Sequence, residues 1–84
     1  MKILHVLRNA DDPKALECIG AQAKENNTTL LLVQDGVDAV TPPEMRTYIL
    51  QEDSDGEPLS PHAHPIGYEE MLKLIFEHDS VVVW

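Results

Sequence analysis

The chain has 84 residues, of which 43% are apolar, and its 15 acidic and 6 basic side chains give a formal net charge of −9 at pH 7. This length and apolar content indicate one small folded domain over residues 1–84 and argue against a disordered chain. Nucleic-acid surfaces need clustered lysine and arginine, so the acidic balance excludes direct nucleic-acid binding.

The sequence shows neither a membrane span nor a secretion signal. No apolar run approaches the ~18 residues needed to cross a bilayer. Met1-Lys2 leads directly into a predicted strand, without a small-residue cleavage site. We therefore expect a cytoplasmic protein. A domain of this size buries only about 60–65% of the surface of its unfolded chain, so we also expect a hetero- or homo-oligomer that covers part of the remaining apolar surface.

The first half of the chain predicts a strand, a helix and a second strand. Residues 2–8 are mostly apolar and predict a central strand. Asp12 can cap a helix and Pro13 fits the first helical position, so a helix is predicted over 13–25. Residues 28–36 predict a second strand, whose four consecutive apolar residues are covered on both faces.

The second half predicts two further strands, a loop and a helix. A short helical turn is predicted over 37–40 and a third strand over 45–51. Residues 52–65 hold four acidic residues and three prolines without a periodic pattern, which predicts a functional or mobile loop. A helix is predicted over 68–77 and a short strand, at or near a sheet edge, over 80–84. The apolar face of that helix is predicted to hold Met71, Leu72, Ile75 and Phe76.

This order of elements predicts an α/β fold. A strand, a helix and a strand within about 33 residues form a βαβ unit, whose crossover is right-handed in nearly all cases. Strands that are buried on both faces occur mostly in parallel sheets between helices. We therefore expect a small three-layer sandwich in which a mainly parallel sheet of four to five strands is flanked by helices.

Cys18 is the only cysteine, so the chain can form neither an internal disulfide nor an all-cysteine metal site. It is the candidate nucleophile, because sulfur chemistry requires an accessible thiolate. It lies more than one turn into its predicted helix, where the helix dipole has faded, and Glu17 precedes it. A partly buried packing cysteine is the alternative interpretation.

The histidines suggest a second kind of site. In an extended segment, His62 and His64 would point the same way and could share a metal ion with Cys18, Asp55 or Glu57. No regular second pair of ligands accompanies them, so a solvated loop is the simpler interpretation and no metal is assigned. His5 is expected to bond a neighbour within the core, and His78 to favour the end of the last helix.

Ligands of open parallel sheets bind beyond the carboxyl ends of the strands. Here these ends carry polar and acidic residues, without a glycine-rich phosphate loop, so no nucleotide or other cofactor is predicted. The acidic character of this rim suits a cation, a basic partner protein or plain solvation, and solvation is the default interpretation. Its segments are Arg8-Asn9, Gln34-Asp35-Gly36 and Gln51-Glu52-Asp53.

Three stretches of the chain form a recognisable combination. They are Ile3-Leu4-His5-Val6-Leu7, residues 30–39 with Asp35-Gly36, and residues 68–78 followed by Trp84. Together they resemble the DsrH/TusB family, whose members commonly begin with a Leu-His strand, carry a Leu-Leu-x-x-Asp-Gly-Val strand end, and finish with a helix and a tryptophan. The order and spacing match over nearly the whole chain.

The resemblance implies the DsrE-like fold and a role in sulfur relay. TusB-like proteins join TusC- and TusD-like subunits in a hexamer that passes persulfide sulfur towards 2-thiolation of the tRNA wobble uridine. DsrH-like proteins act with DsrE and DsrF in sulfur oxidation. Cys18 falls where DsrH-like members carry a cysteine in the first helix, although some TusB-like members lack it. Residues 52–65 depart from the pattern because the usual Arg-Gly pair is absent, which leaves both pathways open.

Three functions follow as hypotheses. In the first, the chain is a sulfur carrier or sulfurtransferase subunit that uses Cys18. In the second, it is a non-catalytic assembly subunit whose acidic surface and Trp84 dock sister subunits. In the third, it is a metal-binding regulator that uses His62 and His64.

Overall fold

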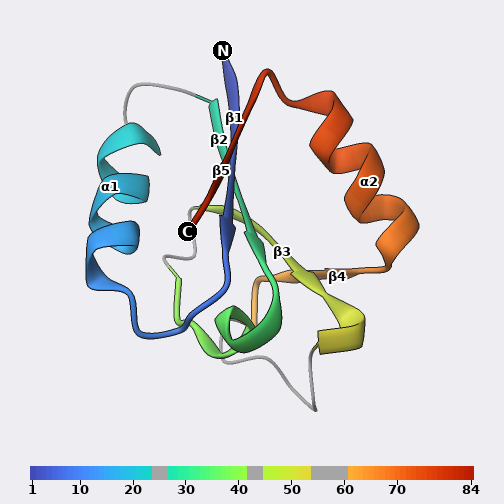
Figure 1. Ribbon diagram of the computed structural model, residues 1–84, viewed down its shortest axis with the longest axis horizontal. Coiled ribbons are helices and arrows are strands. Elements are labelled where there is room, and N and C mark those ends of the chain that lie inside the picture. Colours follow the sequence, from blue (N-terminus) through green and yellow to red (C-terminus); the bar gives the residue numbers. More distant parts are fainter. Residues whose placement is uncertain (24–26, 42–44, 54–60) are drawn as a thin grey trace.

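The computed structural model describes residues 1–23, 27–41, 45–53 and 61–84. Its centre is one sheet of five parallel strands in the order β4-β3-β2-β1-β5, with α1 and α2 on opposite sides (Figure 1). The predicted three-layer α/β fold is therefore confirmed. The strands are β1 (Lys2–Leu7), β2 (Asn27–Leu32), β3 (Arg46–Leu50), β4 (His64–Ile66) and β5 (Ser80–Val83), and the helices are α1 (Pro13–Ala23) and α2 (Tyr68–Glu77).

Alternation of side chains along the strands gives each helix its own half of the core. On the α1 side, Leu7, Leu30 and Leu32 pack with Ala15 and Ile19 of the helix. On the α2 side, a second cluster holds Leu4, Val6, Leu31, Val33, Leu50, Ile66 and Leu74. Both faces of β1 and β2 are thus buried, which explains their nearly unbroken apolar sequence.

The carboxyl ends of the strands are held together by local contacts. The 3₁₀ turn η1 (Gln34–Asp38) follows β2 after Val33, and the 3₁₀ turn η2 (Gln51–Asp53) follows β3 directly. Gln34 adopts the left-handed region with φ of 52°, and its main-chain N–H donates to the Asp53 carboxylate over 2.8 Å. Gly36 passes so close to β1 that an added Cβ would lie 2.1 Å from the main-chain oxygen of Leu7. Only glycine fits this approach.

Two predictions for the second half of the chain need correction. The helical turn expected over 37–40 begins earlier, as η1. The stretch 52–65 was expected to lack regular structure, but its first two residues belong to η2 and its last two residues begin β4, which pairs with β3. A strand of three residues with Pro65 at its centre has no alternating pattern, and proline is tolerated there because β4 lies at a sheet edge. Residues 54–60 of the stretch lie outside the described residues.

In the described parts of the chain, neither helix is long and apolar enough to cross a membrane.

Candidate functional site

Cys18 lies on α1 with its side chain exposed, and it is a free thiol. The buried residues of α1 are Ala15 and Ile19, which pack against the sheet. Although Cys18 is next to Ile19 in sequence, it turns away from the core. The packing alternative for Cys18 is therefore wrong, and the thiol meets the requirement of access for chemistry with another molecule.

The surroundings of Cys18 on the helix surface are polar. Lys14 lies one turn before it, a spacing that places side chains next to each other on a helix, and Lys14 and Glu17 are both exposed. The helix start is capped by Asp12, whose Oδ1 accepts the N–H of Ala15 over 3.1 Å. A macromolecular partner can therefore reach the thiol from solvent, and it would meet the charged side chains of Lys14 and Glu17 beside it.

The predicted core role of His5 is confirmed. The side chain is fully buried in the centre of β1, and both of its ring nitrogens have partners. The indole Nε1 of Trp84 lies 3.0 Å from Nδ1 and can only donate, so Nδ1 carries no proton. The proton is on Nε2, which donates to Gln22 Oε1 over 2.7 Å.

This arrangement holds His5 in the neutral state. Burial lowers the pKa of the imidazole below its usual value, and the hydrogen bond with Gln22 opposes this effect only in part. Gln22 lies one helical turn after Cys18 on α1. However, His5 has no free nitrogen with which to take a proton, so it is a structural residue and not a general base for the thiol.

Trp84 is fixed to β1 by more than its indole. Its main-chain N–H donates to Val6 over 2.9 Å, and its main-chain oxygen accepts from Arg8 Nε over 2.7 Å. The His5 and Trp84 rings are also stacked, with planes 25° apart and centroids 6.0 Å apart. The indole is engaged within the chain, so the docking role that the assembly hypothesis gave to Trp84 has no support.

The carboxyl rim of the sheet consists of groups that bond one another. Arg8 is held by Trp84, and Asp53 by Gln34. The backbone of Val33 donates to Leu7 over 3.1 Å, which closes the ends of β1 and β2. These contacts make the rim a structural junction between strands, and a cofactor is not needed to explain its polar residues.

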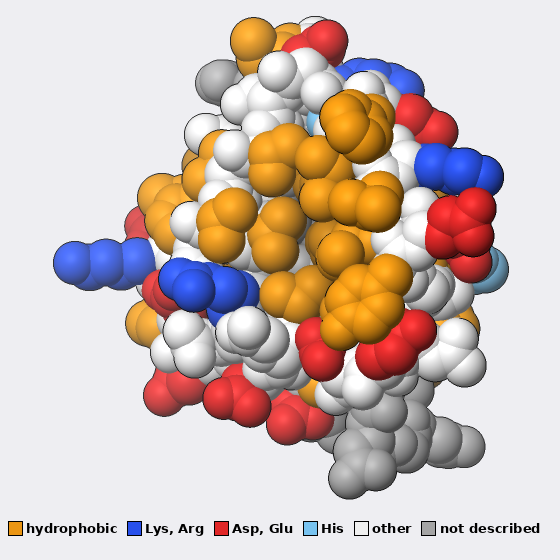
Figure 2. Space-filling model, turned by 45° about the vertical axis from the view of Figure 1, so that its right-hand side comes forward, with side chains coloured by type: hydrophobic (Ala, Val, Ile, Leu, Met, Phe, Trp, Pro, Cys, Tyr) orange, Lys and Arg blue, Asp and Glu red, His pale blue; other side chains and the backbone are white. Residues whose placement is uncertain are grey.

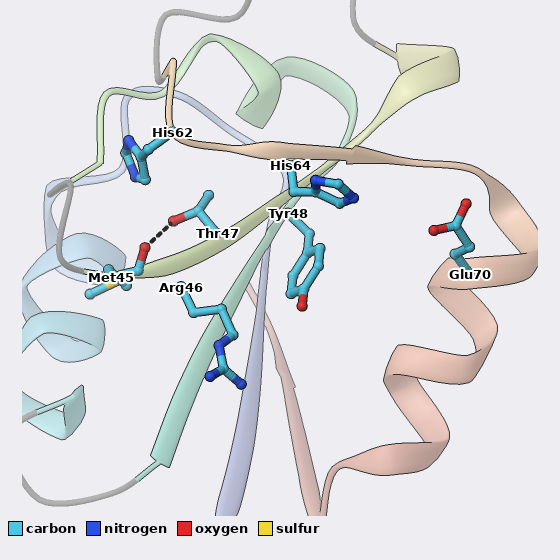
Figure 3. A pocket seen from close by; sticks show the side chains of 7 residues that line it. All are labelled: Met45, Arg46, Thr47, Tyr48, His62, His64 and Glu70. Atoms are coloured by element: carbon cyan, nitrogen blue, oxygen red, sulfur yellow. Dashed lines mark hydrogen bonds between the residues drawn. The ribbon is translucent and has the colours of Figure 1, made fainter.

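A hollow of about 580 Å³ lies at the amino ends of β3 and β4 (Figure 3). Figure 3 shows that His62 and His64 point in opposite directions. His62 Nε2 lies 3.0 Å from the Thr41 hydroxyl, whereas His64 meets the ring of Tyr48 edge-on, with centroids 6.0 Å apart. The lining residues are Met45, Arg46, Thr47, Tyr48, His62, His64 and Glu70.

This geometry does not support the alternative in which His62 and His64 share one ion. The segment turns at His62 before β4 begins, so it is not extended over both histidines. Within residues 1–23, 27–41, 45–53 and 61–84, no group of three His, Cys, Asp or Glu side chains could hold a metal ion. The other expected ligands, Asp55 and Glu57, lie outside the described residues.

An exposed apolar area was missed by sequence reasoning. On the apolar helix face that the sequence predicted, Leu72 is 53% and Phe76 85% exposed, whereas Leu74, which was not assigned to that face, is the buried residue of α2. A hollow of about 340 Å³ lies between α2 and the sheet, and its lining includes Tyr68 of α2 and Val81 and Val83 of β5. We call this area the α2–β5 apolar surface, made of Tyr68, Leu72, Phe76, Val81 and Val83.

Figure 2 shows hydrophobic side chains gathered in one continuous area, with acidic side chains along its lower and right-hand margins. A contiguous apolar area with a polar margin is typical of an interaction surface. The sequence did contain a signal for this exposed area. The apolar stripe on α2 is wider than the part of the helix that the sheet can cover, so some of its apolar side chains have to remain exposed.

Comparison with known proteins does not assign a family. No protein-family model matches the chain, and the search of curated proteins finds no match. The resemblance to the DsrH/TusB family therefore depends on the three stretches quoted above.

Proposed function

We propose that this chain is a sulfur-relay subunit that passes persulfide sulfur between partner proteins, towards 2-thiolation of the tRNA wobble uridine. The observation that supports the proposal is the exposure of Cys18, the only thiol in the chain. It lies in the first helix, where the resemblance places a sulfur-carrying cysteine. A buried thiol at this position would have argued against the proposal.

The chemistry is a transfer of sulfane sulfur. The Cys18 thiolate attacks the outer sulfur of a donor persulfide, a new S–S bond forms, and the donor leaves as a thiolate. An acceptor thiolate on a second partner then attacks the outer sulfur on Cys18 and releases the Cys18 thiolate. Each step exchanges one S–S bond for another, so the sequence needs no external oxidant or reductant.

The partners in this proposal are TusC- and TusD-like or DsrE- and DsrF-like subunits. Because the net charge is −9, another subunit has to hold the tRNA. An accessible thiol on a helix surface suits transfer between proteins, since each partner needs to approach the sulfur closely.

The test is intact mass spectrometry after incubation with glutathione persulfide. The wild-type chain is expected to gain the mass of one sulfur atom, which a reducing agent removes. Cys18→Ser is the matched control, because the side chain is exposed and the change leaves the core intact. A wild-type mass that stays unchanged, while the donor remains active on a control thiol, would contradict the carrier role.

A second candidate is supported by the α2–β5 apolar surface. In this hypothesis the chain is a non-catalytic assembly subunit of a sulfurtransferase hexamer, or a DsrH-like protein of dissimilatory sulfur oxidation, and its partners carry the reactive cysteine. Phe76 is 85% exposed, which suits a contact with another subunit. If Cys18→Ser supports sulfur transfer by the complete assembly as well as the wild-type chain does, this hypothesis replaces the first.

A further inference from the structure

The strand β5 has one unpaired side. It is the last strand in the sheet order and its described partner is β1 alone. The N–H of Trp84 points to β1, where it donates to Val6. Since backbone groups alternate in direction along a strand, those of Val81 and Val83 point to the open side.

This edge lacks the features that usually prevent strands from pairing. Its residues are Ser80 followed by three valines, without a charge, a proline or a bulge within the strand. By comparison, the opposite edge of the sheet, β4, has three residues and Pro65 at its centre. A polar residue would be expected on an edge that stays in water, but Val81 and Val83 are 38% and 58% exposed.

We infer that β5 pairs with β5 of a second copy of this chain, antiparallel about a two-fold axis at Val82. In this register Val81 lies opposite Val83 of the second copy, and the outward backbone groups of both residues form hydrogen-bonded pairs. The two sheets become one sheet of ten strands. The inference does not depend on Cys18 or on sulfur chemistry.

The charges at the two ends of β5 fit this arrangement. Asp79, just before β5, is exposed, and its carboxylate accepts from the main-chain nitrogen of Lys2 over 2.8 Å. The exposed Arg8 lies at the other end, bonded to the main-chain oxygen of Trp84. Antiparallel pairing brings the start of one β5 beside the end of the other. The end of each β5 that carries Asp79 therefore lies beside the end of the other β5 that carries Arg8, and opposite charges meet at both ends of the paired strands.

The apolar surface supports the same occupant. Val81 and Val83 lie on the α2 side of the sheet and line the hollow beside α2. Pairing of two β5 strands joins the valines of both copies into one continuous apolar strip. Because a two-fold interface uses the same patch on both subunits, one exposed strand is sufficient to form it.

Sedimentation velocity of the full chain over a wide range of concentrations tests the inference. We expect a monomer–dimer equilibrium, and Val83→Lys is expected to raise the dimer dissociation constant about tenfold or more, because it places a charge against Val81 of the second copy. Val40→Lys is the matched control. Val40 is 70% exposed and follows η1. The Val40→Lys variant therefore adds the same charge away from β5 and should leave the dissociation constant unchanged.

Cross-linking tests the register in a Cys18→Ser background. Val82→Cys would lie opposite itself, where the Cα atoms of a non-hydrogen-bonded pair are about 4.5 Å apart and within reach of a disulfide. Val81→Cys would lie opposite Val83 of the second copy, which leaves the two new thiols' Cα atoms about 8–9 Å apart and out of reach. Glutathione disulfide is therefore expected to cross-link the first variant and not the second.

A chain that sediments as a monomer at every concentration overturns the inference, and the edge would then suit a strand of a different protein. A dimer that Val83→Lys does not weaken also overturns it, because the contact would lie elsewhere. Equal cross-linking of both cysteine variants contradicts the register. If Val82→Cys loses the circular dichroism spectrum of the folded chain, the dimer dissociation constants of Val83→Lys and Val40→Lys decide whether β5 forms the contact.

Discussion

The buried imidazole of His5 predicts that mild acid destabilises the fold. In the unfolded chain histidine titrates near pH ~6.5, whereas in the folded chain burial lowers the pKa of His5. Below pH ~6.5 the unfolded state therefore binds the proton first, and the free energy of unfolding falls as the pH falls. Above that pH both states are neutral at His5, so its contribution is constant there.

The loss in the free energy of unfolding depends on whether His5, with both ring nitrogens already hydrogen-bonded, stays neutral in the fold. If His5 stays neutral in the fold, lowering the pH to about 5 protonates it in the unfolded state alone and costs at most about 2 kcal/mol. Protonation of Nδ1 would place its N–H against the indole N–H of Trp84, which is 3.0 Å away and cannot accept. This clash is a second physical reason, besides burial, why the folded chain disfavours the protonated imidazole.

Urea denaturation followed by circular dichroism, at about pH 7.5 and pH 5, measures the effect. His5→Gln removes the titrating group, so the variant should lose up to about 2 kcal/mol less than the wild type between the two pH values. His64→Gln is the control, because His64 is exposed and the variant should keep the wild-type difference. Equal losses in His5→Gln and the wild type would refute the reasoning about His5.

Two further predictions concern local backbone structure. Gly36→Ala should destabilise the fold by about 2 kcal/mol or more in the same urea assay, because its Cβ would meet the backbone of Leu7, whereas Gly20→Ala, with nothing within 4 Å, should stabilise α1 by about 0.5–1 kcal/mol. If Gly36→Ala does not destabilise the fold, the close approach at Gly36 is contradicted, and if Gly20→Ala destabilises it, the open surroundings of Gly20 are contradicted. Asp12→Ala should cost about 1 kcal/mol through loss of the cap on Ala15, and no measurable cost would contradict that cap.

Much of the fold could be predicted because its local signals agree. The helix α2 has the bounds that periodicity predicted, 68–77, and α1 begins at the predicted Pro13 but ends within the described residues at Ala23. The strands β1, β2, β3 and β5 lie where apolar runs predicted them, each ending one or more residues earlier. The edge position of β5 is confirmed as well. These elements are each specified by neighbouring residues, so their sequence alone is informative.

The rest depends on contacts between distant residues. The strand β4 is too short to show an alternating sequence pattern, and it is defined by its pairing with β3. The partners of His5 lie 17 and 79 residues away, so spacing gave no indication of them. The exposure of Cys18 depends on the rotation of α1 about its axis relative to the sheet. Helical spacing identifies the face of the helix that packs on the sheet, but it does not show whether a residue beside that face is buried. The role of Cys18 in sulfur transfer stays a prediction.

The contact of Trp84 with His5 has a consequence for the study of folding. Trp84 is the only tryptophan in the chain, so intrinsic fluorescence reports a single event, the docking of β5 on β1. That contact joins the strands farthest apart in sequence, whereas β1, α1 and β2 form a local unit. Because closing a long loop is slow, fluorescence should change after the far-ultraviolet signal of the helices during refolding. The native tryptophan thus distinguishes completion of the sheet from its initiation, without an added label.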